Sequence, residues 1–132
     1  MTDAIVEAYG ATLEEAFENA AKGLMDTMID LKSVRPKKEI KFSSKGHDLY
    51  SLLFDWLDKV MLSLVADRMV ISQFSVKIKQ QIKGYSLEGT ANGEPLDIAR
   101  HGYKVEIKAV TYHEMKITQE KGTVTVRFLL DL

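Results

Sequence analysis

One segment of the chain, residues 49–65, is apolar around most of its helical circumference. Only a narrow polar strip interrupts the apolar surface, and a helix of this kind is stable in water when other elements cover it on most sides. We therefore expect this helix at the centre of the core, with sheet on two sides of it. The apolar stripe consists of Leu49, Leu52, Leu53, Trp56, Leu57, Val60, Met61, Leu64 and Val65, with Phe54 and Leu62 beside it.

A second helix is predicted from Leu13 to near Asp30. Thr12 and Glu15 fit the capping box, in which a hydroxyl accepts a hydrogen bond from the helix N-terminus and a carboxylate reaches back. Apolar residues at helical spacing follow on one face. Asp48 has the residue type of an N-cap for the central helix.

The rest of the sequence alternates between apolar and polar residues, which predicts strands. We expect strands over residues 4–10, 39–44, 74–79, 85–89, 103–109 with a continuation through 115–117, and 123–131. We expect a basic connector over 32–38, turns at 45–47, 80–81 and 120–122, and irregular chain from the loop signal at 92–95 to Gly102. Two helices followed by mostly antiparallel strands predict a single α+β domain over residues 1–132, layered as a β/α/β sandwich.

Composition and charge narrow the classes of function. The formal net charge is −1 and the pI about 6.3, whereas tight nucleic-acid binders usually carry a strong basic excess. We expect no stable DNA binding, although a local basic patch is compatible with this balance. The absence of Cys excludes disulfides and thiolate metal sites. No apolar run is long enough to span a membrane and no secretory signal begins the sequence, so we expect a cytoplasmic protein that does not contact a membrane.

Two carboxylates lie near opposite ends of the sequence, Asp3 and Asp131. If the first and last strands are neighbours, both side chains meet at one edge of the domain, and Leu132 adds backbone or terminal oxygens. Ligands that are all oxygen suit the hard cations Ca²⁺ and Mg²⁺. Aspartates near chain ends are more often simply solvated, and the spacing alone does not distinguish the two interpretations.

Other candidate residues point to no catalytic site. Lys108 lies in a predicted strand and is of interest only if it lies near the acidic pair, where it would bind a phosphate or a carboxylate. The three histidines lack zinc spacing; His47 is expected in a turn, and His113 is expected to be structural rather than catalytic. No nucleophile elbow, phosphate-binding glycine loop or metalloprotease motif is present.

Several blocks of the sequence stand out when they are taken together. They are residues 1–4 with 8–10, 12–21, 48–57, 93–94, 100–102, 105–113 and 130–132. In this combination they resemble the archease family, and the block Lys108–His113 together with Asp131 is specific to it. The resemblance covers residues 1–132. Family members also carry a short strand and a His just before the position of Met1, which this sequence does not contain.

The resemblance implies a function. Archeases assist the RtcB-type RNA ligase, which joins tRNA exons with GTP and a metal, by promoting its guanylylation and its multiple turnover. By position, Asp3, Asp131 and the backbone of Leu132 would bind a divalent ion, and Lys108 would match a lysine that the family requires. The chain would then be an accessory protein and not an enzyme, with the ligase as partner and tRNA contacted only through the ligase.

Two other functions remain open. A general chaperone or protein-modulating module is an older suggestion for the family, and it would require a sizeable exposed apolar patch. A metal-dependent hydrolase acting alone is disfavoured, because the sequence offers only two candidate acidic ligands and no evident base.

Overall fold

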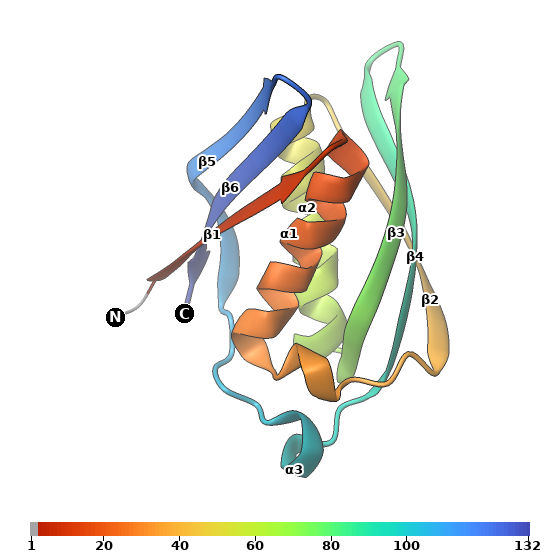
Figure 1. The fold of residues 1–132 in the computed structure, drawn as a ribbon, viewed down its shortest axis with the longest axis vertical. Helices are drawn as coiled ribbons and strands as arrows, with labels where there is room; N and C mark the ends of the chain where they lie inside the picture. Colours follow the sequence, from red (N-terminus) through yellow and green to blue (C-terminus); the bar gives the residue numbers. More distant parts are fainter. Residues whose placement is uncertain (1–2) are drawn as a thin grey trace.

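Two three-stranded antiparallel sheets enclose a pair of long helices in the computed structural model, which describes residues 3–132 (Figure 1). Sheet A has the order β1–β6–β5, with β1 Asp3–Gly10, β5 Ala109–Glu120 and β6 Thr123–Asp131. Sheet B has the order β2–β4–β3, with β2 Lys38–Gly46, β3 Met69–Gln81 and β4 Gly84–Pro95. The helices are α1 Leu13–Met28, α2 Leu49–Val65 and the short α3 Ile98–His101, with a 3₁₀ turn, η1, at Leu31–Ser33. The predicted α+β class and β/α/β layering are confirmed.

Helix α2 is the central element that its apolar circumference predicts. The ring of Trp56 packs edge-to-face against Phe42 of β2 and Phe74 of β3, with centroids 5.3 and 5.9 Å apart. Its indole N–H donates to the carbonyl of Phe17 in α1 at 3.1 Å, so one buried side chain joins both helices to sheet B. Off the main stripe, Phe54 stacks on Tyr112 of β5 at 4.4 Å and thereby covers the side of α2 that faces sheet A.

Both long helices begin where their capping residues predict. The Thr12 hydroxyl accepts from the N–H of Glu15 at 3.1 Å, while the Glu15 carboxylate accepts from the N–H of Ala11 at 2.9 Å. At α2, Asp48 accepts from the N–H of Ser51, whose hydroxyl accepts from the N–H of Asp48 in return. Helix α1 ends at Met28, close to the predicted Asp30. No helix in the described part of the chain is long and apolar enough to cross a membrane.

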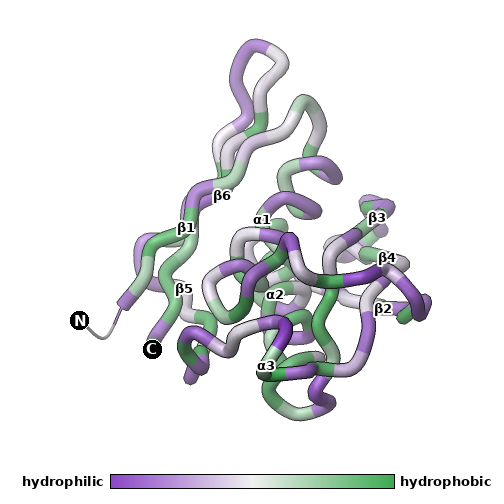
Figure 2. The backbone as a smooth tube through the Cα atoms, turned by 60° about the horizontal axis from the view of Figure 1, so that its bottom comes forward, coloured by the Kyte–Doolittle hydropathy of each residue, from purple (hydrophilic) through white to green (hydrophobic). Residues whose placement is uncertain are grey.

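The strands of sheet A keep one face on the core and one face exposed. Burial alternates along β1 and β6, and the hydropathy of the backbone changes repeatedly along both strands (Figure 2). The inner residues Val126, Phe128 and Leu130 are fully buried, whereas Asp3 and Glu7 on the outer face are exposed. This alternation is the period-two pattern of a half-buried antiparallel sheet.

Side chains of the helices bond the outer strands of both sheets. An outer strand presents backbone N–H and C=O groups that no neighbouring strand pairs. Helices α1 and α2 supply polar side chains that bond some of these groups. The bonds join Glu18 to the N–H of Val76 (2.9 Å), Tyr50 to the N–H of Ile117 (3.2 Å), Asn19 to the carbonyl of Tyr9 (2.7 Å) and Lys59 to the carbonyl of Ser43.

The loop predicted at residues 92–95 is wrong, because these residues form the end of β4. Gly93 serves a close approach of two strands and not a turn: a Cβ there would lie 1.9 Å from the carbonyl oxygen of Val70 in β3. The β3–β4 register shifts between Ile71 and Gln73, which places this contact at a β-bulge. Strand β3 also extends beyond the predicted 74–79, so the turn predicted at 80–81 falls at residues 82–83.

The strand predicted over residues 103–109 is also wrong in its first part. Residues 102–108 form no regular structure, and β5 begins only at Ala109. Residues 98–101, predicted to be irregular, form α3 at the lower end of the molecule in Figure 1. Ile107 is buried, as the alternation predicts, but the neighbouring backbone bonds to the end of α1: the N–H of Lys104 donates to the carbonyl of Met28 at 2.7 Å.

Replacing Gly93 with Ala tests the bulge. We expect Gly93→Ala to lower the free energy of unfolding by about 2–3 kcal/mol, because the added methyl group forces β3 and β4 apart. The matched control is Gly122→Ala in the β5–β6 hairpin, where φ is +78° and an added Cβ meets nothing within 4 Å. Its left-handed backbone should cost about 1–2 kcal/mol. Urea unfolding measures both, and equal losses would contradict the close-approach role of Gly93.

Candidate functional site

The first and last strands bring Asp3 and Asp131 together. Strands β1 and β6 pair antiparallel along their whole length, and Asp3 lies directly opposite Asp131 in this register. Directly paired residues project from the same face with Cβ atoms about 4.5–5.5 Å apart. Because the neighbouring Leu130 is fully buried, both carboxylates lie on the outer face of sheet A. Asp3 is exposed and Asp131 is half-buried.

A hollow of about 340 Å³ lies beside the carboxylate pair. It is formed where β5 and β6 lose their regular pairing, since the register shifts between Thr111 and Lys116. Glu114 in this bulge has φ of +54°, and the N–H of His113 donates to the Thr111 hydroxyl at 3.2 Å. The hollow is lined by Asp3, Thr111, His113, Glu114, Leu129 and Asp131. The bulge thus adds an imidazole and a third carboxylate to the surroundings of the pair.

His113 lies in β5, in the bulged part of the strand. Its side chain is exposed and lines the hollow beside the two aspartates. Glu114 is engaged by the guanidinium of Arg127 at 3.0 Å. The bulge lies between Thr111 and Lys116, so His113 is outside the regular pairing of β5 with β6. His47, in contrast, lies in the bend before α2, as predicted.

Lys108 is anchored to the same place through its backbone. It precedes β5 and is not inside a strand as predicted, but its N–H donates to the carbonyl of Asp131 at 2.7 Å. The Lys108 side chain is exposed, and among residues 3–132 it forms no ion pair within 4.0 Å. Leu132 follows Asp131 and packs partly against the core. All four residues singled out from the sequence therefore lie at one end of sheet A.

The donor atoms at this place suit a hard cation only in part. Carboxylate oxygens of Asp3 and Asp131 and a backbone oxygen of Leu132 are the ligand type of Ca²⁺ and Mg²⁺. Within the described residues, however, no three His, Asp or Glu side chains are grouped closely enough to hold a metal ion by themselves. A cation there would need water or another molecule to complete its coordination.

A buried charged cluster at the end of β4 is the feature that sequence reasoning missed. One oxygen of Glu94 accepts from the Arg100 guanidinium, the N–H of Arg35 and the His101 ring, each at 2.8 Å. The other ring nitrogen of His101, Nδ1, accepts from the N–H of Asp97 at 2.9 Å. Nδ1 is therefore unprotonated, and Nε2 carries the proton that His101 donates to Glu94.

The cluster fixes the segment that leads to Lys108. Glu94 and His101 are buried, and the carbonyl of His101 accepts from the N–H of Asp30 after α1 at 2.9 Å. Arg100 also donates to the carbonyl of Ser33 at 2.8 Å, so α3 is fastened to η1. The sequence signal was available, because residues 93–94 and 100–102 belong to the blocks of the archease resemblance. The pattern gives no sign that these blocks meet in space.

Comparison with known proteins gives a consistent set of relatives. The family description Archease protein family (MTH1598/TM1083) matches residues 1–132. The protein archease of Methanopyrus kandleri is 38% identical over 130 residues, covering 98% of this chain and 93% of its own. That of Methanothermobacter thermautotrophicus is 40% identical over 130 residues, covering 98% and 92%.

Solved structures agree with these relatives. The solution structure of Methanobacterium thermoautotrophicum protein 1598 is 40% identical, with a TM-score of 0.85, and covers 100% of this chain and 94% of its own. The crystal structure of a Thermotoga maritima archease, described as a possible chaperone, is 19% identical with a TM-score of 0.68, and covers 99% and 91%. At that identity the second structure supports the fold alone.

Acid should destabilise the protein through Glu94. The hydrogen bond from Arg100 holds the pKa of the Glu94 carboxyl well below its ordinary value of 4.5. A carboxyl whose pKa is lowered in the native state contributes its full stabilisation when the pH is above the ordinary pKa. The contribution declines as the pH falls below it, because the unfolded chain then binds a proton that the native chain resists.

Urea unfolding of the wild type and Glu94→Gln at pH 7 and pH 3 measures this effect. We expect the variant to be less stable at pH 7, because Arg100 loses its charged partner, and the difference to shrink at pH 3. Glu120→Gln, at an exposed position in β5, is the control and should match the wild type at both pH values. A difference for Glu94→Gln that is the same at both pH values would contradict the assignment.

Proposed function

Because the chain belongs to the archease family, we propose that it is an accessory protein that activates an RtcB-type tRNA-splicing RNA ligase. In this proposal it promotes guanylylation and multiple turnover of the ligase in the cytoplasm and has no turnover of its own. The observation that carries the proposal is the pairing of Asp3 with Asp131 on an exposed sheet face, with Lys108 bonded beside them.

We further propose that Asp3, Asp131 and a backbone oxygen of Leu132 hold a divalent cation, Ca²⁺ or Mg²⁺. Such a cation would supply positive charge near nucleotide phosphates. The two carboxylates are held by adjacent strands, so binding requires little rearrangement of the backbone. Asp3 is exposed and Asp131 half-buried on the outer face, which leaves the remaining coordination sites accessible to water or to groups of the ligase.

Lys108 contributes a second positive charge in this proposal. Its backbone is fixed by the carbonyl of Asp131, while its side chain is exposed. An ammonium group on a flexible stem is suited to a phosphate or to a carboxylate of the partner. Because α3 and the Glu94 cluster fasten the preceding segment, the position of Lys108 depends on that cluster. The tRNA is held by the ligase, so the site formed by Asp3, Asp131 and Lys108 contacts the tRNA only through the ligase.

Ligase turnover with and without this protein, at varied metal concentration, tests the proposal. We expect the wild type to raise the rate of guanylylation, and Asp3→Ala, Asp131→Ala and Lys108→Ala each to abolish most of that stimulation. Glu120→Ala and Lys116→Ala are matched controls, since both residues are exposed on β5 of the same sheet. Both controls should stimulate like the wild type. Normal stimulation by all three site variants would refute the proposed site.

Calorimetric titration with Ca²⁺ and Mg²⁺ tests the metal separately. We expect binding by the wild type and at least a tenfold loss of affinity on Asp131→Ala or Asp3→Ala, because each substitution removes one carboxylate ligand. Lys108→Ala should keep its affinity, since an ammonium group is no ligand. Unchanged affinity in both aspartate variants would place the cation elsewhere.

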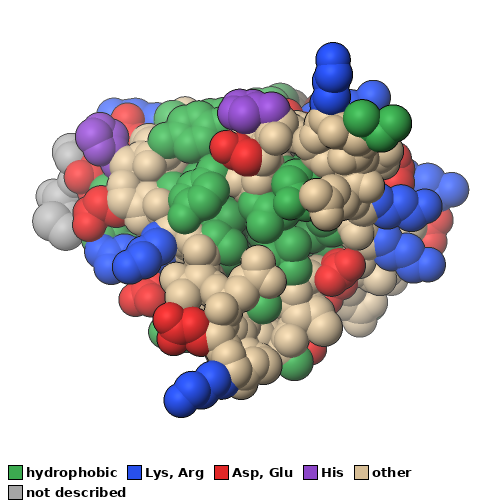
Figure 3. Space-filling model, turned by 90° about the horizontal axis from the view of Figure 1, so that it is seen from above, with side chains coloured by type: hydrophobic (Ala, Val, Ile, Leu, Met, Phe, Trp, Pro, Cys, Tyr) green, Lys and Arg blue, Asp and Glu red, His purple; other side chains and the backbone are tan. Residues whose placement is uncertain are grey.

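A chaperone-like function is the second candidate, favoured by exposed apolar side chains. Seen from above, hydrophobic side chains gather between the ends of the two sheets (Figure 3). Tyr50, Tyr112 and Ile82 are among the exposed large apolar residues, at 38%, 53% and 102% of full exposure. Suppression of aggregation of unrelated proteins that is lost on Tyr112→Ser, but kept on Asp131→Ala, would favour this function over ligase activation.

A further inference from the structure

We propose that the outer face of sheet B is a weak, sequence-independent binding surface for structured RNA. The surface lies on the opposite side of the molecule from Asp3 and Asp131, because the two sheets lie on either side of the helix pair (Figure 1). This proposal depends on the proposed function in one respect only: the RNA that binds this surface would be the RNA held by the ligase.

The register of sheet B gathers lysines on one face. Residues paired directly across antiparallel strands project to the same side. Because Phe42 and Val76 face the core, the residues next to them along β2 and β3 face outward and are exposed. Three successive rows of this kind cross β2, β4 and β3 in that order, and together they are here called the basic face. The rows are Lys41 with Thr90 and Ser75, Ser43 with Glu88 and Lys77, and Lys45 with Ser86 and Lys79.

The positive charge of the basic face is not neutralised from within. In the described residues 3–132, the four lysines of the face form no ion pair within 4.0 Å. Glu88 is its one acid and accepts from the Ser43 hydroxyl at 3.1 Å; the adjoining row carries one more acid, Glu39. Figure 3 shows Lys and Arg side chains projecting from the side of the molecule where sheet B lies.

Sheet A has the opposite charge on its outer face. Asp3, Glu7 and Asp131 project there, Arg127 is paired with Glu114, and Lys116 is the lysine directly opposite Arg127. The formal net charge of −1 is a sum over the whole chain and does not report this difference between the two faces. This segregation reconciles a near-neutral chain with a local binding surface, because attraction of a polyanion depends on the local field.

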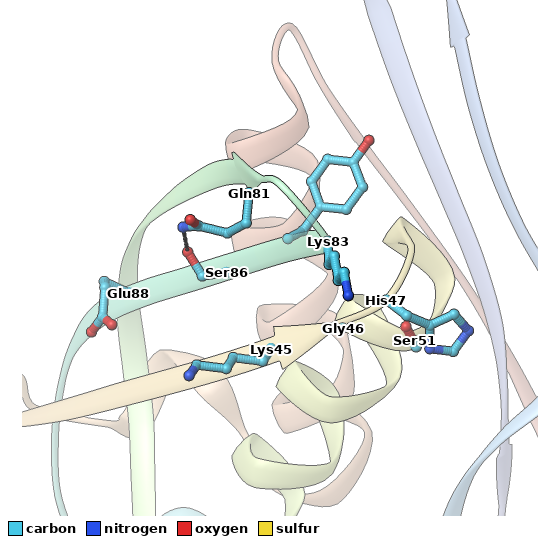
Figure 4. Close-up of a pocket in the computed structure, with 9 residues that line it drawn as sticks. Lys45, Gly46, His47, Ser51, Gln81, Lys83, Ser86 and Glu88 are labelled. Carbon is cyan, nitrogen blue, oxygen red and sulfur yellow. Dashed lines mark hydrogen bonds between the residues drawn. The ribbon is translucent and has the colours of Figure 1, made fainter.

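Two hollows run along the basic face. One, of about 310 Å³, is lined by Lys41, Ser75, Lys77 and Thr90. The other, of about 740 Å³, lies at the β3–β4 hairpin, where Lys83 and His47 approach one another from the hairpin and from the start of α2 (Figure 4). Both hollows border on Glu88, so they adjoin along the strands. Lysine and serine side chains line each hollow, and the carboxylate of Glu88 lies between them.

The side chains of the face favour structured RNA over other polyanions. Lysine and hydroxyl groups contact phosphate and sugar without reading the bases. The three rows present no aromatic side chain on which unpaired bases stack, and the rings of Tyr85 and His47 lie only in the hollow at the hairpin end. Over the rows, a duplex recognised by shape and phosphates therefore fits better than a single strand. They also present no large apolar side chain that would insert into a lipid surface.

Fluorescence anisotropy with a labelled RNA hairpin tests this surface directly. We expect a dissociation constant of about 10⁻⁴–10⁻⁶ M at low salt, with a slope of log K against log salt of about −2 to −4 for a face of this charge. The double substitution Lys41→Glu with Lys77→Glu should weaken binding at least tenfold. Lys32→Glu with Lys116→Glu changes the net charge equally at exposed positions in η1 and on sheet A, and should weaken it less than threefold.

The outcomes also separate this proposal from ligase activation. Loss of RNA binding in Lys41→Glu with Lys77→Glu, with RNA-free guanylylation of the ligase still stimulated, supports the surface. Equal weakening by both double variants overturns it, as does RNA binding that is insensitive to salt. Loss of RNA-free stimulation with RNA binding intact also overturns it, because the face would then dock on the ligase. Asp131→Ala should keep RNA binding even if metal activation fails, and circular dichroism verifies that each variant is folded.

Discussion

The packing of Trp56 against sheet B and α1 is the constraint on which the rest of the structure depends. The sheets are not hydrogen-bonded to one another, so each is held in place by the helices between them. Trp56 meets aromatic rings of β2 and β3 and bonds the backbone of α1. Sheet A covers the other side of the helix pair and is closed by the pairing of the first strand with the last. The acidic pair on its outer face is a consequence of that closure.

Local signals in the sequence predicted the helices better than the strands. The caps at Thr12 and Asp48 are bonds within four residues, so they can be read directly. The error at residues 92–95 arose because Gly93 and Pro95 are turn formers by type, whereas Gly93 is required by the distant Val70. The error at 103–108 arose because alternation reports which side chains are buried, not which backbone groups pair.

The candidate site was predictable in its residues and not in its surroundings. Asp3, Lys108 and Asp131 were named from sequence, and the β1–β6 register places them together. The hollow beside the pair, with His113 and Glu114, depends on a bulge in β5, and a bulge leaves no mark in the alternation. The whole-chain charge concealed the basic face for a similar reason: a sum over the sequence carries no information on which face a residue occupies.

The side-chain bonds along the outer strands affect how copies of this protein meet. Glu18 occupies the N–H of Val76, and Tyr50 occupies that of Ile117. A strand with some of its free groups already engaged is a poorer template for the strand of another chain. The two helices thus reduce the number of backbone groups that an outer strand offers to a second molecule.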